Sequence, residues 1–213
     1  MQANRGKIKY SILKVMETDV RMIEDSVVEE ISLTLFYNGE QLVTLCCSPS
    51  QIEELILGFL LSERLIDKYE DIYSLKYVPE VNCVYVEGRD LASTTYGKLS
   101  SACCGKSRPA LAFADDLQIT RAVRSDIRIP LEDVYFYADY LQNHLPLFQE
   151  TGGVHSGGIA KNRQILFTSY DIGRHNVLDK LYGQASRHGI NLSDHIVFFS
   201  GRVASEILFK VAK

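Results

Sequence analysis

The chain has 213 residues, 46% of them hydrophobic, which is enough for one large domain or two small subdomains with a core that needs no disulfides. Its net charge of −4 excludes a global basic field for nucleic acid. The polar start lacks the apolar stretch of a signal peptide, and the longest apolar run, residues 55–61, is too short to span a bilayer. Five cysteines, with two adjacent pairs, fit a reducing compartment better than a disulfide framework. We therefore expect a cytoplasmic protein that binds neither nucleic acid nor membrane.

The first part of the chain is typical of a β-rich subdomain. Residues 31–35 alternate between apolar and polar as a half-buried strand does, and Asn38-Gly39 is a strong hairpin signal. The segments expected to form strands are residues 8–20, 31–35, 42–47, 73–78 and 81–86. Cys46, Cys47 and Cys83 fall within these strands, so we interpret them as ordinary packing residues.

One helix is expected inside this region. Ser48-Pro49-Ser50-Gln51 has a capping serine, a proline suited to the first helical position and a glutamine placed for a capping box. The residues that follow, from Ile52 to Leu60, place apolar side chains at helical spacing. This pattern indicates a core helix rather than a partner-binding stripe.

A long polar connection, residues 91–108, carries the second pair of adjacent cysteines, Cys103 and Cys104. Lys98, Lys106 and Arg108 flank the pair, and nearby cations lower a thiol pKa and so favour the reactive thiolate. Long loops in compact domains are often functional. The alternative is that these cysteines are small buried hydrophobes, but their polar, glycine-containing surroundings favour chemistry.

The C-terminal part alternates between strands and helices. Helices are expected at residues 129–144, 173–188 and 202–213, and strands at 154–160, 164–170 and 196–199. Such alternation implies a partly parallel α/β sheet that is covered on both faces. We place the boundary between an N-terminal β-rich subdomain, residues 1–95, and a C-terminal α/β core, residues 96–213, just before the cysteine pair.

Two strand-to-helix junctions are unusually polar. The first is Asp171-Ile172-Gly173-Arg174-His175-Asn176, and the second is Ser200-Gly201-Arg202. Each brings a glycine and an arginine to a helix amino end, where backbone N–H groups and a planar guanidinium favour phosphate. Together they could hold an extended, multiply phosphorylated ligand. The alternative is that Asp171, Arg174 and Arg202 form only ion pairs and caps.

A third polar cluster contains Gly152, Gly153 and His155, followed by two further glycines. Glycines so close together in a strand suggest the close approach of backbone or ligand. His155 could be a base, a ligand contact, a metal ligand or a structural residue. No zinc-deaminase motif is present, because His155-Ser156-Gly157 lacks the required glutamate and Cys103-Cys104 lacks a two-residue spacer. We therefore expect no intrinsic metal.

Taken together, these motifs resemble those of the FdhD family of formate dehydrogenase accessory sulfurtransferases. The matching segments, in the family's order, are residues 58–63, 100–108, 151–155, 171–180 and 200–202. The resemblance implies a fold similar to cytidine deaminase, with a mixed sheet and helices on both faces, and a homodimer.

The resemblance also implies a function. A cytoplasmic sulfur carrier would accept sulfur from a cysteine desulfurase as a persulfide. It would pass that sulfur to a molybdenum (or tungsten) bis(molybdopterin guanine dinucleotide) cofactor, its bound substrate, before insertion into formate dehydrogenase. A guanine nucleotide such as GDP could mimic this substrate at Gly152, Gly153, His155 and the two polar junctions.

Two departures from the family pattern are relevant. Many members carry Cys-x-x-Cys where this chain has Cys103-Cys104, so either cysteine could carry the sulfur. The family normally continues beyond the helix that follows Ser200-Gly201-Arg202, so the chain is expected to be truncated there. The rival hypothesis is a chaperone that delivers the pterin without carrying sulfur. A dithiol oxidoreductase is weaker, because adjacent cysteines form a strained disulfide.

Overall fold

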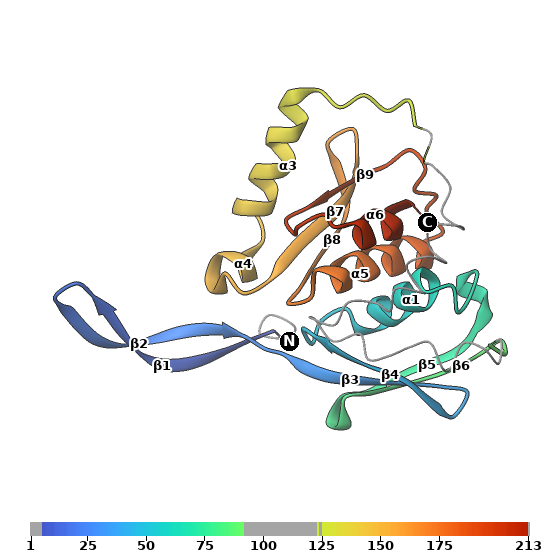
Figure 1. The fold of residues 1–213 in the computed structure, drawn as a ribbon, viewed down its shortest axis with the longest axis horizontal. Coiled ribbons are helices and arrows are strands. Elements are labelled where there is room, and N and C mark those ends of the chain that lie inside the picture. Colours follow the sequence, from blue (N-terminus) through green and yellow to red (C-terminus); the bar gives the residue numbers. More distant parts are fainter. Residues whose placement is uncertain (1–5, 92–122, 124, 213) are drawn as a thin grey trace.

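The computed structural model describes residues 6–91, 123 and 125–212. Its first element is a two-stranded antiparallel ribbon, β1 (Lys7–Met16) and β2 (Asp19–Val28), which extends away from the rest of the molecule (Figure 1). The sequence pattern predicted one strand over residues 8–20. The chain instead turns at Glu17, whose φ is 42°, and pairs back along its whole length.

The second sheet has four strands in the order β4-β3-β6-β5. These are β3 (Ile31–Tyr37), β4 (Glu40–Cys47), β5 (Ile72–Val78) and β6 (Cys83–Gly88), with short 3₁₀ turns at Tyr69–Asp71 and Pro79–Val81. β3 and β4 form the expected hairpin, because Asn38 and Gly39 adopt the positive φ angles, 48° and 85°, of a tight turn. β3 and β6 are parallel, which makes this sheet mixed.

Helix α1 (Ile52–Ser62) covers one face of the four-stranded sheet. Leu33, Leu35, Leu55 and Leu60 are fully buried between them, as the alternating and helical patterns predicted. The predicted cap is wrong. Gln51 is the N-cap residue in a left-handed conformation, and Ser48 points instead toward the strand-to-helix junction described below.

The third sheet has the order β8-β7-β9, formed by β7 (His155–Lys161), β8 (Gln164–Asp171) and β9 (Ile196–Phe199). Both neighbouring pairs are antiparallel, so the expectation of a partly parallel sheet here is wrong. The reason is the order of the strands. β8 and β9 run in the same direction, but β7 lies between them, and the parallel pair of the described chain is β3 with β6.

Helices lie on both faces of this sheet, as expected (Figure 1). On one face α3 (Leu131–Asn143) stacks Tyr137 on Phe198, with ring centroids 5.0 Å apart. The short α4 (Pro146–Thr151) follows it. On the other face lie α5 (Arg174–Arg187) and α6 (Ser205–Ala212). Tyr137 is the buried residue of α3, whereas Val134 on the same helix is 50% exposed.

The two sheets are joined where α1 crosses α5. A Cβ added to Gly58 would lie 1.7 Å from the Asp179 carbonyl oxygen, and one added to Gly183 would lie 2.0 Å from that of Glu54. The helices therefore touch backbone to backbone, which glycine alone allows. The architecture is mixed α/β. The cytidine-deaminase-like arrangement and the boundary at residue 95 stay predictions.

Candidate functional site: a cationic sheet edge

The candidate site lies at one edge of the third sheet, where β8 and β9 end, β7 begins and α5 starts. The two polar junctions predicted from the sequence meet there. Ser200 extends the ladder past β9, since its N–H donates to the Ser156 carbonyl (2.9 Å) and its Oγ accepts from the Ser156 N–H (2.8 Å). Antiparallel pairing thus places Ser200-Gly201-Arg202 beside the start of β7.

Three basic side chains gather at this edge. Burial, followed by the positive charges of Arg174 and Arg202, lowers the pKa of His155 below its ordinary 6.5. The close approach involves Gly201, where an added Cβ would come within 3.3 Å of the Arg174 Cβ. Arg202 is exposed, whereas Arg174 and His155 are half-buried. The edge is therefore electropositive, with His155 biased toward its neutral form.

One basic atom at this edge has an unmet hydrogen-bonding capacity. Nε of Arg174 is buried and has no hydrogen-bond partner among the described residues. A buried donor without a partner is costly, so such a donor calls for an explanation, and a bound anion or ligand at the edge is one that fits a guanidinium. Helix α5 adds further donors. Gly173 is its N-cap without a side-chain cap, so the first N–H groups of the helix are available to an anion.

Asp171 and Asn176, predicted as ligand contacts, belong to a buried network. Asp171 is fully buried and its Oδ1 accepts from the Gly173 N–H and from the Asn176 amide, both at 2.8 Å. Asn176 also donates to the Cys46 carbonyl at 2.8 Å. These contacts attach the β8–α5 junction to the end of β4. They fit the ion-pair and cap alternative and leave little of either side chain for a ligand.

The centre of this network is Lys180, which the sequence patterns did not single out. Its Nζ lies 2.6 Å from Asp171 Oδ2 with both side chains fully buried, and it also donates to the Tyr170 carbonyl at 3.1 Å. Ser48 closes the network from β4, donating its N–H to Asp171 at 3.1 Å. The sequence does contain one signal for this role. Lys180 lies between Leu178 and Leu181, two buried apolar residues, on a helix that is covered on two sides.

His175, also predicted as a contact, points toward α6 instead. Its Nε2 lies 3.2 Å from Glu206 Oε2, and behind it Lys210 binds Asp179 at 2.6 Å. Burial, together with the charges of Lys210 and Arg174, lowers the pKa of His175. The structure thus brings His155, Arg174, Ser200, Gly201 and Arg202 together, and turns His175 toward a different cluster.

The two glycines before β7 have local structural roles. Gly152 ends α4 in a left-handed conformation with φ of 60°, which favours glycine. Gly153 lies against β2, where an added Cβ would be 2.8 Å from a methyl carbon of Val28. Their assignment as ligand contacts stays a prediction.

Cys103 and Cys104 lie outside the described residues. Among the described cysteines, Cys47 is fully buried, and burial, followed by the charge of Asp171, raises its pKa to about 12. Such a thiol is inert at neutral pH. Cys46 and Cys83 are half-buried on strands, in keeping with their expected packing roles.

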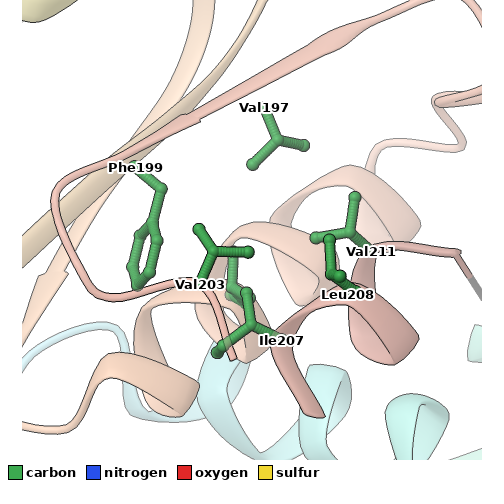
Figure 2. Close-up of a pocket in the computed structure, with 7 residues that line it drawn as sticks. Val197, Phe199, Val203, Ile207, Leu208 and Val211 are labelled. Carbon is green, nitrogen blue, oxygen red and sulfur yellow. The ribbon is translucent and has the colours of Figure 1, made fainter. Parts of the chain in front are cut away.

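An apolar cavity of about 180 Å³ borders the cationic edge (Figure 2). It lies between β9, α5 and α6, and Phe199, whose ring is 6.4 Å from that of His155, forms one wall. Its lining is aliphatic or aromatic throughout, so the cavity cannot recognise a charged group. In the part of the chain that the structure describes, no helix is long and apolar enough to cross a membrane, and no three His, Cys, Asp or Glu side chains are grouped to hold a metal ion.

The fold and the edge define a class: a mixed α/β protein with a cationic sheet edge. The model of the FdhD/NarQ family matches residues 28–213, and the chain belongs to this family. Curated relatives named "Sulfur carrier protein FdhD" are similar throughout. That of Halalkalibacterium halodurans is 35% identical over 100% of this chain and 79% of its own. The relative from Bacillus pumilus is 39% identical over 89% of this chain and 73% of its own length.

A solved structure supports the same fold. The crystal structure of a protein described as a formate dehydrogenase accessory protein, from Desulfotalea psychrophila, has a TM-score of 0.76 with 21% sequence identity. It covers 97% of this chain, which covers 79% of that one. The family resemblance inferred from the motifs is therefore confirmed.

Proposed function

We propose that this chain is a sulfur carrier that serves formate dehydrogenase. In this proposal it accepts sulfur from a cysteine desulfurase as a persulfide on Cys103 or Cys104. It then transfers the sulfur to the molybdenum bis(molybdopterin guanine dinucleotide) cofactor, its substrate, before the cofactor enters the enzyme. The proposal rests on the family and on the names of its curated members.

The observation that supports binding of the cofactor as substrate is the buried Nε of Arg174 on the cationic edge, which has no hydrogen-bond partner among the described residues. A guanine dinucleotide substrate presents phosphates, and Arg174, Arg202 and the amino end of α5 offer a guanidinium pair and free N–H donors. His155, neutral because its pKa is lowered, would donate or accept a hydrogen bond there without adding charge.

The sulfur half requires a reactive thiolate. The thiolate on this chain attacks the outer sulfur of the donor persulfide, a new S–S bond forms, and the donor cysteine leaves as its own thiolate. In the onward transfer the S–S bond of the persulfide breaks and its electron pair stays on the carrier cysteine as the thiolate, while the outer sulfur passes to the cofactor, which supplies the electron pair of the new bond. Cys47, with its pKa near 12, cannot take this role at neutral pH. The flanking Lys98, Lys106 and Arg108 favour the pair at 103–104.

The test is intact-mass analysis after incubation of the reduced protein with a cysteine desulfurase and cysteine. A gain of about 32 Da, one sulfur atom, should appear and should disappear in the Cys103→Ala/Cys104→Ala variant. The single variants identify the carrier. Cys83→Ala is the matched control, because this half-buried strand cysteine should not affect loading.

Two results would count against this proposal. One is the absence of an adduct on the freshly reduced wild-type protein. If guanine nucleotide still binds in that case, the chaperone that delivers the pterin without carrying sulfur becomes the better hypothesis. The other is an adduct that survives in the double cysteine variant, which would place the sulfur on a residue other than Cys103 and Cys104.

A further inference from the structure

Helix α6 follows the Ser200-Gly201-Arg202 junction but packs on the molecule through few apolar side chains. Among its described residues Ile207 alone is buried, in the apolar cluster that α5 forms on the third sheet. Leu208 and Val211 are 59% and 49% exposed, and they line the apolar cavity between α6, β9 and α5 (Figure 2). An eight-residue helix with one buried apolar side chain gains little from burial. A polar contact is therefore needed to hold α6 in place.

Lys210 provides this contact. Its Nζ lies 2.6 and 2.7 Å from the two carboxylate oxygens of Asp179 on α5, and it donates to Ser62 Oγ on α1 at 3.0 Å. The carboxylate of Glu63, the C-cap residue of α1, lies 3.6 Å from the same ammonium. The three donors of the ammonium thus face acceptors from two other helices. One side chain connects α6 to both α1 and α5.

This contact is almost completely removed from water. The side chains of Lys210 and Asp179 are 11% and 3% exposed, and Ser62 is 2% exposed. A buried ion pair is screened much less than one at the surface, and the loss of one partner leaves the other charge without compensation. The attachment of α6 to the α1–α5 pair is therefore narrow but strong.

The other polar contact of α6 is weaker. His175 Nε2 lies 3.2 Å from Glu206 Oε2, but this nitrogen forms no hydrogen bond with the described residues. Burial, followed by the charges of Lys210 and Arg174, lowers the pKa of His175, so its imidazole is neutral at pH 7. A neutral imidazole forms no ion pair with a carboxylate. Lys210 therefore supplies most of the polar attachment of α6.

The position of α6 matters because Arg202 lies just before it. Arg202 is exposed and forms no ion pair with any residue that the structure describes. Its place is set through the backbone. On one side the Ser200 N–H donates to the Ser156 carbonyl at 2.9 Å, and on the other α6 begins at Ser205. If α6 moved away, the short segment between these two points would carry Arg202 with it.

We infer that Lys210 is a positioning residue for the cationic edge: by binding Asp179 and Ser62 it holds α6 on the α1–α5 pair, and so keeps Arg202 beside Arg174. The inference rests on the proposed function in one respect, namely that the edge binds the phosphates of the substrate. The position of Arg202 itself can be measured without a ligand. Two tests on the full chain follow from this difference.

The first test uses the His155 imidazole to report on Arg202. Burial, followed by the charges of Arg174 and Arg202, lowers the pKa of His155, and Lys210 is not among the charges that act on it. NMR titration should therefore give a higher His155 pKa in Lys210→Met than in wild type, approaching that of Arg202→Ala. A His155 pKa equal to that of wild type would overturn the inference.

The second test measures the binding of guanosine diphosphate by calorimetry in a double-mutant cycle. Lys210→Met should weaken binding by about 10-fold, because it releases an arginine that bonds to the phosphates. If Lys210 acts through Arg202, Lys210→Met/Arg202→Ala binds no more weakly than Arg202→Ala alone. Additive losses would contradict the inference, since Lys210 would then affect the ligand by another route.

Two further variants control for the charge and for the fold. Lys210→Met leaves the Asp179 carboxylate buried without a partner, so Lys210→Met/Asp179→Asn, which removes both charges, is measured in parallel and should raise the His155 pKa equally. Lys161→Met is the matched control, because Lys161 pairs with Asp194 at the opposite end of β7 from His155. It should leave both measurements at their wild-type values, and an equal effect there would also overturn the inference. Far-UV circular dichroism verifies that each variant is folded.

The two tests separate this inference from the proposed function. If the wild-type protein does not bind guanosine diphosphate, the proposed function loses its substrate site, and the titration of His155 still decides whether Lys210 positions Arg202. If wild type binds the nucleotide but His155 titrates identically in Lys210→Met, the inference fails and the proposed function stands.

Discussion

The two strand-to-helix junctions at the sheet edge look alike in sequence but differ in structure. In the β8–α5 junction, Asp171 and Asn176 are buried and hydrogen-bonded to neighbours from β4 and α5. In the β9–α6 junction, Ser200 and Arg202 are exposed, and Arg202 sits beside Arg174 and His155. A charged residue at a helix start can therefore belong to the scaffold or to the site. Whether its hydrogen-bonding capacity is already used within the chain distinguishes the two.

The largest expected effect comes from breaking the buried junction. Lys180→Ala leaves the Asp171 carboxylate fully buried without its ammonium partner, and we expect a loss of about 3–5 kcal/mol in the free energy of unfolding, measured by urea denaturation. The matched change at the exposed junction, Arg202→Ala, should stay within about 0.5 kcal/mol of wild type. Equal losses in both variants would contradict the contrast between the two junctions.

A smaller effect is expected on ligand binding. Here the arginines of the cationic edge should matter, whereas the buried network should matter for stability. Arg202→Ala and Arg174→Ala should each weaken binding of guanosine diphosphate, measured by calorimetry, by about 10- to 100-fold, the value of a hydrogen bond to a charged group. Arg187→Ala is the control, because Arg187 pairs with Glu53 and Glu54 on α1. If the control loses as much affinity as the two edge variants, the nucleotide binds elsewhere.

The scaffold can also be tested away from the edge, on the helix that carries the buried junction. Gly183→Ala places a methyl group 2.0 Å from the Glu54 carbonyl oxygen, and overpacking of this kind costs about 1–3 kcal/mol. Ser186→Ala, three residues later on α5, should change stability by less than about 0.5 kcal/mol. Thermal and urea unfolding measure both. A neutral Gly183→Ala would mean that the helices separate easily.

The smallest effect concerns the titration of His155. Its pKa should lie below 6.5, and NMR of the imidazole should show it rising in Arg202→Ala as one positive charge is removed. Since the folded protein binds this proton more weakly than the unfolded chain does, the contribution to stability is complete above about pH 6.5 and is lost as pH falls toward the lower, folded pKa. If the titration midpoint of His155 is the same in Arg202→Ala as in wild type, Arg202 does not act on His155 and does not belong to the site.

Much of the local structure could be predicted from the sequence. Asn38-Gly39 fixed the β3–β4 hairpin because both residues tolerate positive φ, and the apolar period located α1 and α5. Strand order could not be read in this way, because β7 pairs with both β8 and β9 across an intervening helix. The capping prediction failed since Ser48 is used by a tertiary contact, to the Ile172 N–H, that no local pattern reveals.

The site was predicted in part. The sequence located the two junctions, and the structure brings Arg174, Arg202 and His155 together because β7 begins between the ends of β8 and β9. It could not separate Asp171 from Arg174, because both are charged residues at a helix start. Lys180 was missed for a different reason. Its importance depends on the burial of α5 from two sides, whereas helical periodicity identifies only one buried face.

The glycine contact between α1 and α5 also restricts how the molecule can move. Two helices separated by a layer of side chains can slide as rotamers change, whereas carbonyl oxygens that meet glycine Cα atoms leave no such slack. The four-stranded and three-stranded sheets should therefore behave as one rigid body. Any rearrangement on binding a ligand would then occur at the periphery, with the cationic edge held at a constant distance from α1.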